Sequence, residues 1–356
     1  MKPLPIGLDI GTTTVRLLQL GGKEQDLRVM DAGKAGIPAE VKADPKRRRE
    51  FLLENVRRLV KERRFRGRET VMTLPPGAMA VRNIRMPKMP DEELVTAVNW
   101  EAQNKFPFDT ATAVIQHLRA GEVRQGDQAL DEIILLAVPR AEIDAQIQFT
   151  CEAGLDLVSL DAGPCAIFRG FERHLRRRED ESAVTVVADI GAQTTVIISS
   201  GRNVAFVKTI PIGGAVFNRA VAESLELAPA EAEALRRRGD RDHVGRAVAH
   251  AMRPHLEDLA NEIGLCLRYY AVTFRGARPE QIILTGGEAH DPYIPPTLGE
   301  RLAMRTEVGD PFRGVRTETM GHVLDRRGTR SEWATAFGLS LKGFHLADQF
   351  AAGYAA

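Results

Sequence analysis

A carboxylate, a glycine and three hydroxyl groups follow one another near the N-terminus, in the segment DIGTTT at residues 9–14. The glycine lets the backbone approach a ligand closely, and the N–H groups of such a turn, together with threonine hydroxyls, can bind phosphate oxygens. The carboxylate can hold Mg²⁺ through bound waters, because this ion gives up its hydration shell reluctantly. Taken alone, the segment is also compatible with a hairpin that has no chemical function. The candidate residues are Asp9, Gly11, Thr12, Thr13 and Thr14.

The segment DIGAQTT at residues 189–195 repeats this set of groups later in the chain. Two such hairpins could clamp a triphosphate from both sides of a cleft, with one metal ion between Asp9 and Asp189. The chain contains neither the GxxxxGK[ST] phosphate loop nor the GxGxxG dinucleotide motif, so neither of those binding modes is expected. The candidate residues of the second segment are Asp189, Gly191, Gln193, Thr194 and Thr195.

Two further features could bind the rest of a nucleotide. An apolar strand expected at 281–285 runs into Gly286-Gly287, whose bare backbone would let a flat base lie against it. A tight turn is the other explanation of this glycine pair. Glu233 and Arg236 stand three residues apart and therefore on one face of a helix, where they could contact a ribose hydroxyl and an adenine or phosphate. An exposed ion pair is the alternative for these two residues.

The composition excludes several classes of protein. The 356 residues contain 49 Lys and Arg and 48 Asp and Glu, a net charge of +1 that argues against a dedicated nucleic-acid binder. Three cysteines without a CxxC pair are typical of a reducing compartment rather than of a disulfide framework. The N-terminus lacks a secretory signal pattern, and no segment has the ~18 apolar residues that a transmembrane helix needs. We expect a cytoplasmic, multidomain protein.

Short strands would position the first candidate segment. Apolar runs at 4–10 and 15–20 predict two strands joined by a tight turn, and 27–30 extends this meander. A helix is expected over 46–64 behind Asp44 and Pro45, and its many arginines form either a solvated face or a patch for phosphate or a partner. Further strands are expected at 70–74, 132–138 and 155–160, and further helices from Asp91, over 140–153 and from 163 to about 178.

The chain then repeats its own pattern. The run RRREDES at 176–182 is interpreted as a hinge between two parts. The segments GLDIGTTTVRLL at 7–18 and VADIGAQTTVII at 187–198 align over twelve positions, and such a repeat predicts two homologous α/β halves that face each other. The remaining helices are expected at about 213–226, 229–238, 242–276, 293–303 and 333–343.

The order of two hairpins, a Glu–Arg helix and a Gly-Gly turn resembles the actin-like ATPase superfamily, which includes actin, heat-shock 70 proteins, sugar kinases and the division protein FtsA. Within it, the chain resembles the PilM family of actin-like proteins of type IV pilus assembly. The most specific segment is VRNIRMPKMPDEELVTAVNWEAQNKFPFD at 81–109, an insert with a basic strand, an acidic helix start and a Pro-Phe end. Segments 151–171 and 282–312 also resemble this family.

The resemblance implies an α/β, actin-like ATPase fold with two homologous ribonuclease-H-like halves around a nucleotide cleft. Residues 1–180 would form the first half, with an inserted α/β subdomain at about 85–155 and a C-terminal helix at 333–356 that completes it. Residues 181–332 would form the second half, with a helical subdomain at about 213–280.

The resemblance also implies ATP and Mg²⁺ as cofactors. The segments 9–14 and 189–195 match the two phosphate loops, and Asp9 and Asp189 match the metal-binding carboxylates. The other matching positions are Gly213 and Gly214 at the start of the helix behind the nucleotide, Glu233 and Arg236 as the adenosine-contacting pair, and Gly286 and Gly287 as the adenosine turn.

Family members bind the N-terminal cytoplasmic peptide of PilN, a single-span inner-membrane protein, beside the inserted subdomain. By this resemblance, residues 85–155 are expected to bind such a peptide, with Trp100 and Phe106 as candidate contacts. Trp100 could equally belong to a core. The expected location is the cytoplasm, peripheral to the inner membrane, with membrane contact only through the partner, no nucleic-acid partner, and self-association left open.

Three alternatives differ in chemistry. A small-molecule kinase of the same fold would need a carboxylate base, for which Asp161 is the candidate by position, although a helix-capping role also explains it. An FtsA-like division protein would need a basic amphipathic membrane helix, which the C-terminus FHLADQFAAGYAA lacks. A scaffold without nucleotide binding would not retain both hairpins. Ala192 and Gln193 replace glycines of the better hydrolases, and Arg236 replaces the usual lysine, so at most slow ATPase activity is expected.

Overall fold

The computed structural model describes residues 2–351 apart from 43, 104, 174, 176–182, 240–241, 277 and 325–328. The run interpreted as a hinge, at 176–182, and the end of the expected C-terminal helix, at 352–356, lie outside the described residues.

Two five-stranded sheets of identical topology confirm the internal repeat. The first has the order β3-β2-β1-β4-β8 and the second the order β11-β10-β9-β12-β13. In each sheet an antiparallel meander of three strands is followed by two strands that run parallel to its first strand. The strands are β1 (Pro3–Ile10), β2 (Thr14–Lys23), β3 (Asp26–Gly36), β4 (Glu69–Thr73), β8 (Asp156–Asp161), β9 (Val184–Ile190), β10 (Thr194–Ser200), β11 (Asn203–Ile210), β12 (Gln281–Thr285) and β13 (Arg305–Val308).

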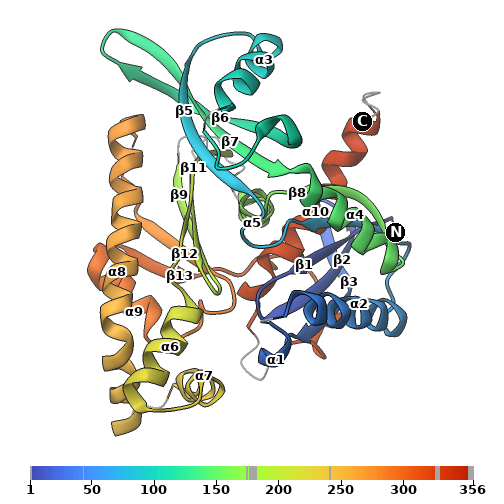
Figure 1. Ribbon diagram of the computed structural model, residues 1–356, viewed down its shortest axis with the longest axis vertical. Coiled ribbons are helices and arrows are strands. Elements are labelled where there is room, and N and C mark those ends of the chain that lie inside the picture. The colour runs from blue at the N-terminus through green and yellow to red at the C-terminus, as the bar shows by residue number, and fades with distance from the viewer. Residues whose placement is uncertain are drawn as a thin grey trace.

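Helices cover both faces of the first sheet (Figure 1). The apolar stripe of α2 (Pro45–Glu62) packs Leu52, Val56 and Leu59 onto one face. The helix begins as predicted, because the Asp44 carboxylate accepts hydrogen bonds from two backbone N–H groups and Pro45 occupies the first turn. The last helix, α10 (Ala334–Ala351), packs on the opposite face. The other helices of this half are α1 (Ala39–Lys42) and α4 (Arg140–Glu152).

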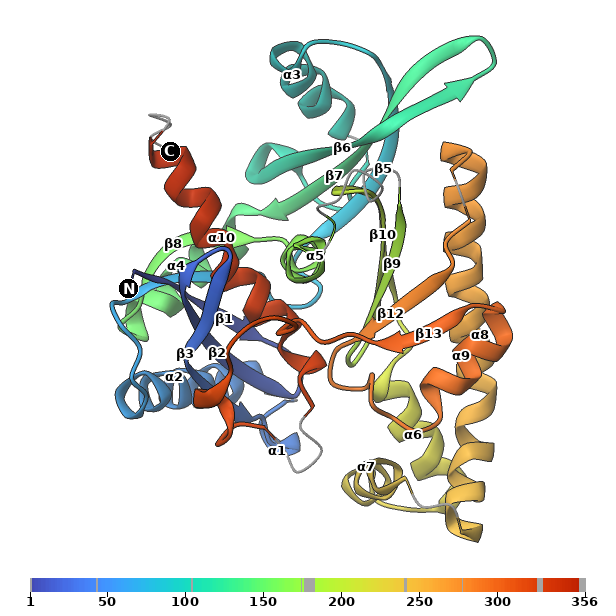
Figure 2. The same ribbon diagram turned by 180° about the vertical axis from the view of Figure 1, so that it is seen from behind.

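The second sheet is covered in a similar way. The long α8 (His243–Phe274) packs Met252, Leu259 and Ile263 onto one face and lies along the outer edge of the molecule in Figure 1. On the other face lies α5 (Gly163–Glu172), whose Ile167 packs in one cluster with β9 and β10. This helix also contacts α10, so it stands between the two halves (Figure 2). The second half also contains α6 (Gly214–Leu225), α7 (Pro229–Arg238) and α9 (Ile294–Leu302), whereas α5 precedes it in the chain.

The predicted insert forms a separate three-stranded antiparallel sheet of order β5-β7-β6, seen at the top of Figure 1. Its elements are β5 (Ala80–Pro87), α3 (Asp91–Ala102), β6 (Ala113–Gln125) and β7 (Gln128–Pro139). Leu94 and Val98 of α3 pack against one face of this sheet. The other face packs through Ile134 and Leu136 against Val207 of β11, so the insert contacts the second half directly.

Several elements differ from the sequence-based expectation. Asp91 does not cap α3: Pro90 holds the capping position, and the Asp91 carboxylate accepts a 2.7 Å hydrogen bond from Arg119. Helix α5 ends at Glu172, earlier than expected, and α10 continues to Ala351. Strands β6, β11 and β13 were not anticipated. Within the described part of the chain, no helix has the length and apolar character needed to cross a bilayer.

Candidate functional site

The two predicted carboxylates occupy equivalent places, because Asp9 stands near the end of β1 and Asp189 near the end of β9. Burial raises the pKa of Asp189 to about 7, and the neighbouring Asp9 charge adds to this shift while Arg16 opposes it. Burial also raises the pKa of Asp9, against the effect of Arg16. The fold thus brings two half-buried carboxylates close enough for their charges to repel, and oxygen ligands of this kind are suited to a divalent cation.

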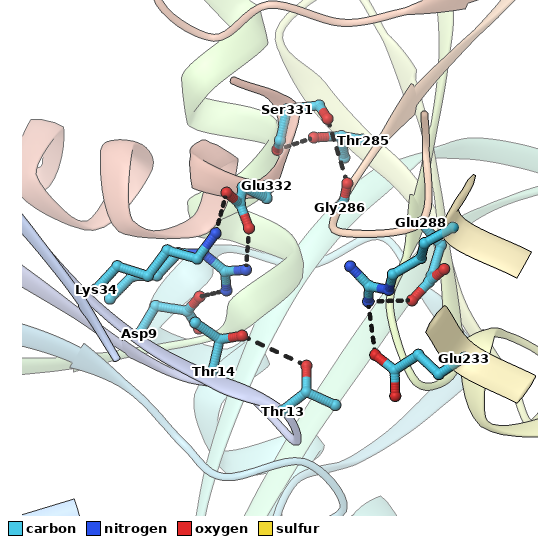
Figure 3. Close-up of polar contacts among 12 residues, drawn as sticks. Asp9, Thr13, Thr14, Lys34, Glu233, Thr285, Gly286, Glu288, Ser331 and Glu332 are labelled. Atoms are coloured by element: carbon cyan, nitrogen blue, oxygen red, sulfur yellow. Dashed lines mark hydrogen bonds and ion pairs between the residues drawn. The ribbon is translucent and has the colours of Figure 1, made fainter. Parts of the chain in front are cut away.

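Asp9 is surrounded by a network of charged side chains that the sequence did not predict. Arg16 lies opposite Asp9 on β2, with Nη1 3.5 Å from an Asp9 oxygen and Nη2 2.6 Å from Glu332. Lys34 of β3 donates a 2.6 Å hydrogen bond to the other Glu332 oxygen (Figure 3). Burial disfavours the charged form of Glu332, but Arg16 and Lys34 outweigh burial and hold its pKa below the ordinary value. The three charges fix the start of α10 to the first hairpin.

The first hairpin presents its polar groups at the surface. The Gly11 N–H donates to the Thr14 carbonyl at 3.0 Å and closes the turn. Thr12 and Thr13 are exposed, whereas Thr14 is buried. The hydroxyls of Thr12 and Thr13 are therefore the accessible ones of the three that the sequence suggested.

The second hairpin also closes through its glycine, but over one residue fewer, with the Gly191 N–H donating to the Gln193 carbonyl at 2.9 Å. Gln193 is exposed, and Thr195 lies opposite Asp189 on β10. Thr194 is buried, and its hydroxyl donates a 2.7 Å hydrogen bond to the Ile212 carbonyl. The Thr194 hydroxyl thus connects the second hairpin to the segment before α6.

The glycine pair after β12 has two different environments. Gly286 adopts a φ of 90°, and a Cβ there would lie 2.5 Å from the Ile190 carbonyl oxygen and 2.7 Å from an Asp189 oxygen. Gly287, by contrast, has no atom within 4 Å of the position of a Cβ. The turn therefore packs tightly on the end of β9 through its first glycine and leaves the second glycine open. Its position is also tied to Ser331, which exchanges hydrogen bonds with Thr285 and Gly286 (Figure 3).

Gly213 and Gly214 lie against the same region. The Gly214 N–H donates to the Gly191 carbonyl at 2.8 Å, and a Cβ on Gly214 would lie 2.6 Å from an oxygen of Glu288. The start of α6 therefore joins the second hairpin to the segment that follows the glycine turn.

Arg236 and Glu233 are not partners of each other. Arg236 is fully buried, with Nη2 2.6 Å from Glu288, Nη1 paired with Asp291 and Nε 2.9 Å from the Asn218 side chain. Each of its three guanidinium nitrogens is thus bonded to the protein. Sequence spacing did not predict this burial, because spacing shows which side chains share a helix face but not whether that face is buried.

The neighbouring Arg237, and not Arg236, is the partly exposed arginine that pairs with Glu233. Its Nη2 lies 3.1 Å from Glu233 and 3.2 Å from Glu288 (Figure 3). Glu233 and Arg237 are both partly exposed, so they are the accessible charged pair of this helix.

Asp161 has a structural environment that does not suit a kinase base. Its carboxylate lies 2.7 Å from Arg169 and 3.1 Å from Lys342, and it is almost fully buried. These contacts join β8, α5 and α10. Each carboxylate oxygen is already paired with a cation from the protein, so neither is free to approach a substrate hydroxyl.

The insert carries a hollow of about 460 Å³ beside α3. The Trp100 side chain is 71% exposed on this helix, so its assignment to a core is wrong. Phe106 is half-buried against the core of the insert and stacks on Phe108 at 5.6 Å between ring centroids. The hollow is lined by Asn99, Gln103, Asp109, Thr110, Ala111 and Ile115.

Comparison with known families identifies this combination of repeated halves and insert. A family model described as "Type IV pilus assembly protein PilM" matches residues 7–344. The chain belongs to the PilM family. A solved structure described as the PilM-PilN type IV pilus biogenesis complex contains a chain with 26% sequence identity and a TM-score of 0.79, over 95% of this chain and 98% of that chain. The predicted membership in the PilM family is confirmed, and the kinase and FtsA-like alternatives are not favoured.

More distant structures share the fold of the PilM family. The ethanolamine utilization protein EutJ from Carboxydothermus hydrogenoformans has 14% identity and a TM-score of 0.57, over 96% of this chain and 90% of EutJ. MreB5 of Spiroplasma citri bound to ADP has 12% identity and a TM-score of 0.52, over 99% of both chains. These likenesses confirm the predicted actin-like α/β fold. No curated protein matches the sequence.

Proposed function

We propose that this PilM-family chain binds Mg·ATP between its two halves and, on its inserted subdomain, binds the N-terminal cytoplasmic peptide of a PilN-like inner-membrane protein. The observation that carries the nucleotide proposal is the juxtaposition of Asp9 and Asp189 at equivalent ends of two repeated sheets. Each carboxylate stands beside a hairpin with exposed N–H groups or hydroxyls, the donors that phosphate oxygens need.

The metal fits this pair of carboxylates. A Mg²⁺ ion held by Asp9 and Asp189, in part through waters, would offset the burial and the Asp9 charge that together raise the pKa of Asp189. The bound ion would neutralise charge on the phosphates. Gly11, Thr12 and Thr13 would contact the phosphates from the first half, and Gly191 and Gln193 from the second. Ala192 and Gln193 differ from the glycines of efficient hydrolases, so we propose at most slow hydrolysis.

The base would lie against the open backbone of Gly287, which has no neighbouring atom where a side chain would project. The accessible pair Glu233 and Arg237 would contact the sugar or base. Arg236, bonded to Glu288 and Asp291, would support the turn from behind.

The partner proposal starts from the relative in the PilM–PilN complex, which shares 26% identity over nearly the whole chain. The exposed Trp100 offers an apolar anchor for a peptide, and the same helix contributes Asn99 to a hollow of about 460 Å³. Binding the cytoplasmic end of a membrane protein would place the chain in the cytoplasm, at the inner membrane, with membrane contact through the partner.

We propose that the nucleotide state sets the affinity for the peptide. Residues 1–180 with the C-terminal helix would move as one half and residues 181–332 as the other. The insert belongs to the first half by sequence but contacts the second half, where the Tyr269 hydroxyl of α8 donates a 2.5 Å hydrogen bond to Glu132. Glu132 is almost fully buried and also accepts from Arg85 at 3.1 Å. Closure of the halves around a nucleotide would therefore act on the insert directly.

Calorimetric titration of Mg·ATP into the wild-type protein and into Asp9→Ala and Asp189→Ala tests the nucleotide proposal. We expect saturable binding to the wild type and none to either variant, with circular dichroism spectra unchanged. Binding that survived both substitutions would contradict the proposed site.

A further inference from the structure

The first two turns of α2 carry three successive arginines that point in different directions, because each residue of a helix turns the side chain by about 100°. Arg47 lies 3.6 Å from Asp44, and Arg49 forms a two-pronged pair with Glu152 at 3.0 and 2.9 Å. Arg48, between them, reaches the first hairpin, where its Nη2 donates a 3.0 Å hydrogen bond to the Gly11 carbonyl. The sequence identified this arginine-rich helix without a function for any one residue.

Arg48 has no carboxylate partner among the described residues. Arg16 and Lys34, the other cations near this hairpin, share Glu332. Arg48 is half-buried, and this burial lowers its pKa. The Gly11 carbonyl engages one of the five guanidinium N–H donors. A half-buried guanidinium with unused donors beside a phosphate loop is suited to bind an anion.

We infer that Arg48 binds the terminal phosphate of the nucleotide and favours ATP over ADP. This inference rests on the proposed nucleotide site. There, the base lies on the second half at Gly287, whereas Gly11 belongs to the first half. The phosphate that reaches the neighbourhood of Arg48 is therefore the one furthest from the base. A planar guanidinium fork matches two oxygens of that phosphate, and ADP offers no group at this place.

Titrations of Mg·ATP and Mg·ADP into the full-length wild type, Arg48→Gln and Arg47→Gln test this inference. Glutamine retains an N–H donor for the Gly11 carbonyl while removing the charge and the fork. In Arg48→Gln we expect the affinity for Mg·ATP to fall tenfold or more and that for Mg·ADP to change less than threefold. Arg47→Gln, the matched control whose side chain pairs with Asp44, should leave both affinities unchanged.

An equal loss for both nucleotides would show that Arg48 merely supports the hairpin, and no loss would show that it lies away from the ligand; either result overturns the inference. Arg48→Lys keeps the charge without the planar fork, so it should retain only part of the wild-type preference for ATP over ADP. This variant tests the inference if Arg48→Gln folds poorly. A wild type that binds neither nucleotide would overturn the proposed function itself.

Discussion

At the scale of single residues, the pKa of Asp189 is set by its burial and by the neighbouring charge of Asp9. Burial disfavours the ionised form of a carboxylate, and a second negative charge nearby disfavours it further. The pKa of Asp189 accordingly rises to about 7. The unfolded chain has an ordinary aspartate pKa of about 3.9. Between these values the folded state binds more protons than the unfolded state, so the stability of the metal-free protein falls as the pH rises from about 4 to above 7.

Asp189→Asn should abolish this part of the pH dependence, because the amide is neutral throughout. In EDTA, we expect the unfolding free energy of the wild type to fall relative to that of the variant by about 2–3 kcal/mol between pH 5 and pH 8. Urea denaturation of both proteins over this range measures the difference. Parallel pH profiles would show that the carboxylate is not held in a raised-pKa environment.

The sequence predicted some of these residues and missed others for a physical reason. Asp9 and Asp189 could be proposed as a pair because each stands two residues before a glycine turn in a repeated pattern. Glu332 could not, since it stands 316 residues from Arg16 and meets it only because α10 returns to the first sheet. The burial of Arg236 depends likewise on Glu288 and Asp291, more than 50 residues away.

At the scale of elements, the turn after β12 allows a matched pair of substitutions. In Gly286→Ala the Cβ would meet the Ile190 carbonyl at 2.5 Å in a left-handed backbone, so we expect a loss of about 1–3 kcal/mol in the unfolding free energy. Gly287→Ala has open space and should leave stability unchanged. Its methyl group would project where we place the base, so nucleotide affinity should fall. Thermal denaturation and calorimetry separate the two effects, and unchanged affinity in Gly287→Ala would contradict the position of the base.

Helix α3 allows a separate test of the partner surface. Trp100→Ala should weaken binding of the N-terminal peptide of the PilN-like partner tenfold or more, because a large exposed aromatic side chain is a typical anchor. The affinity for Mg·ATP should not change. Val158→Ala on β8 removes another exposed apolar group, 38% accessible and outside residues 85–155, and serves as the control. Equal peptide affinity in Trp100→Ala and wild type would place the peptide elsewhere.

Elements with strong local signals were predictable from the sequence. Helix α2 has both a capping aspartate and an apolar stripe at helical spacing, and it begins where expected. Strand β6, AVIQHLRAGEVRQ, has no clean alternation, since it pairs with β7 and packs partly on the second half. Its identity as a strand depends on those distant contacts, which the local pattern does not contain.

At the scale of the whole molecule, the insert bridges the two halves, and the Tyr269 hydroxyl forms a hydrogen bond across its contact with the second half. Tyr269→Phe would keep the ring packed on Phe206, at 5.0 Å between centroids, and remove only the hydrogen bond to Glu132. We expect the difference in peptide affinity between the Mg·ATP and Mg·ADP forms to shrink at least threefold, with nucleotide affinity unchanged. Tyr270→Phe, in the same helix but within the core of the second half, is the control. An unchanged difference in Tyr269→Phe would show that this contact carries no coupling.

The central claim is that the chain binds a membrane partner in a manner set by its nucleotide. Its most direct test is a calorimetric titration of the wild type with a synthetic peptide from the cytoplasmic N-terminus of the PilN-like protein, once with Mg·ATP and once with Mg·ADP. The account predicts saturable one-to-one binding whose affinity differs between the two nucleotides. Equal affinity in both states would contradict the coupling of the halves to the insert, and no binding in either state, with ATP itself bound, would contradict the assignment of the partner.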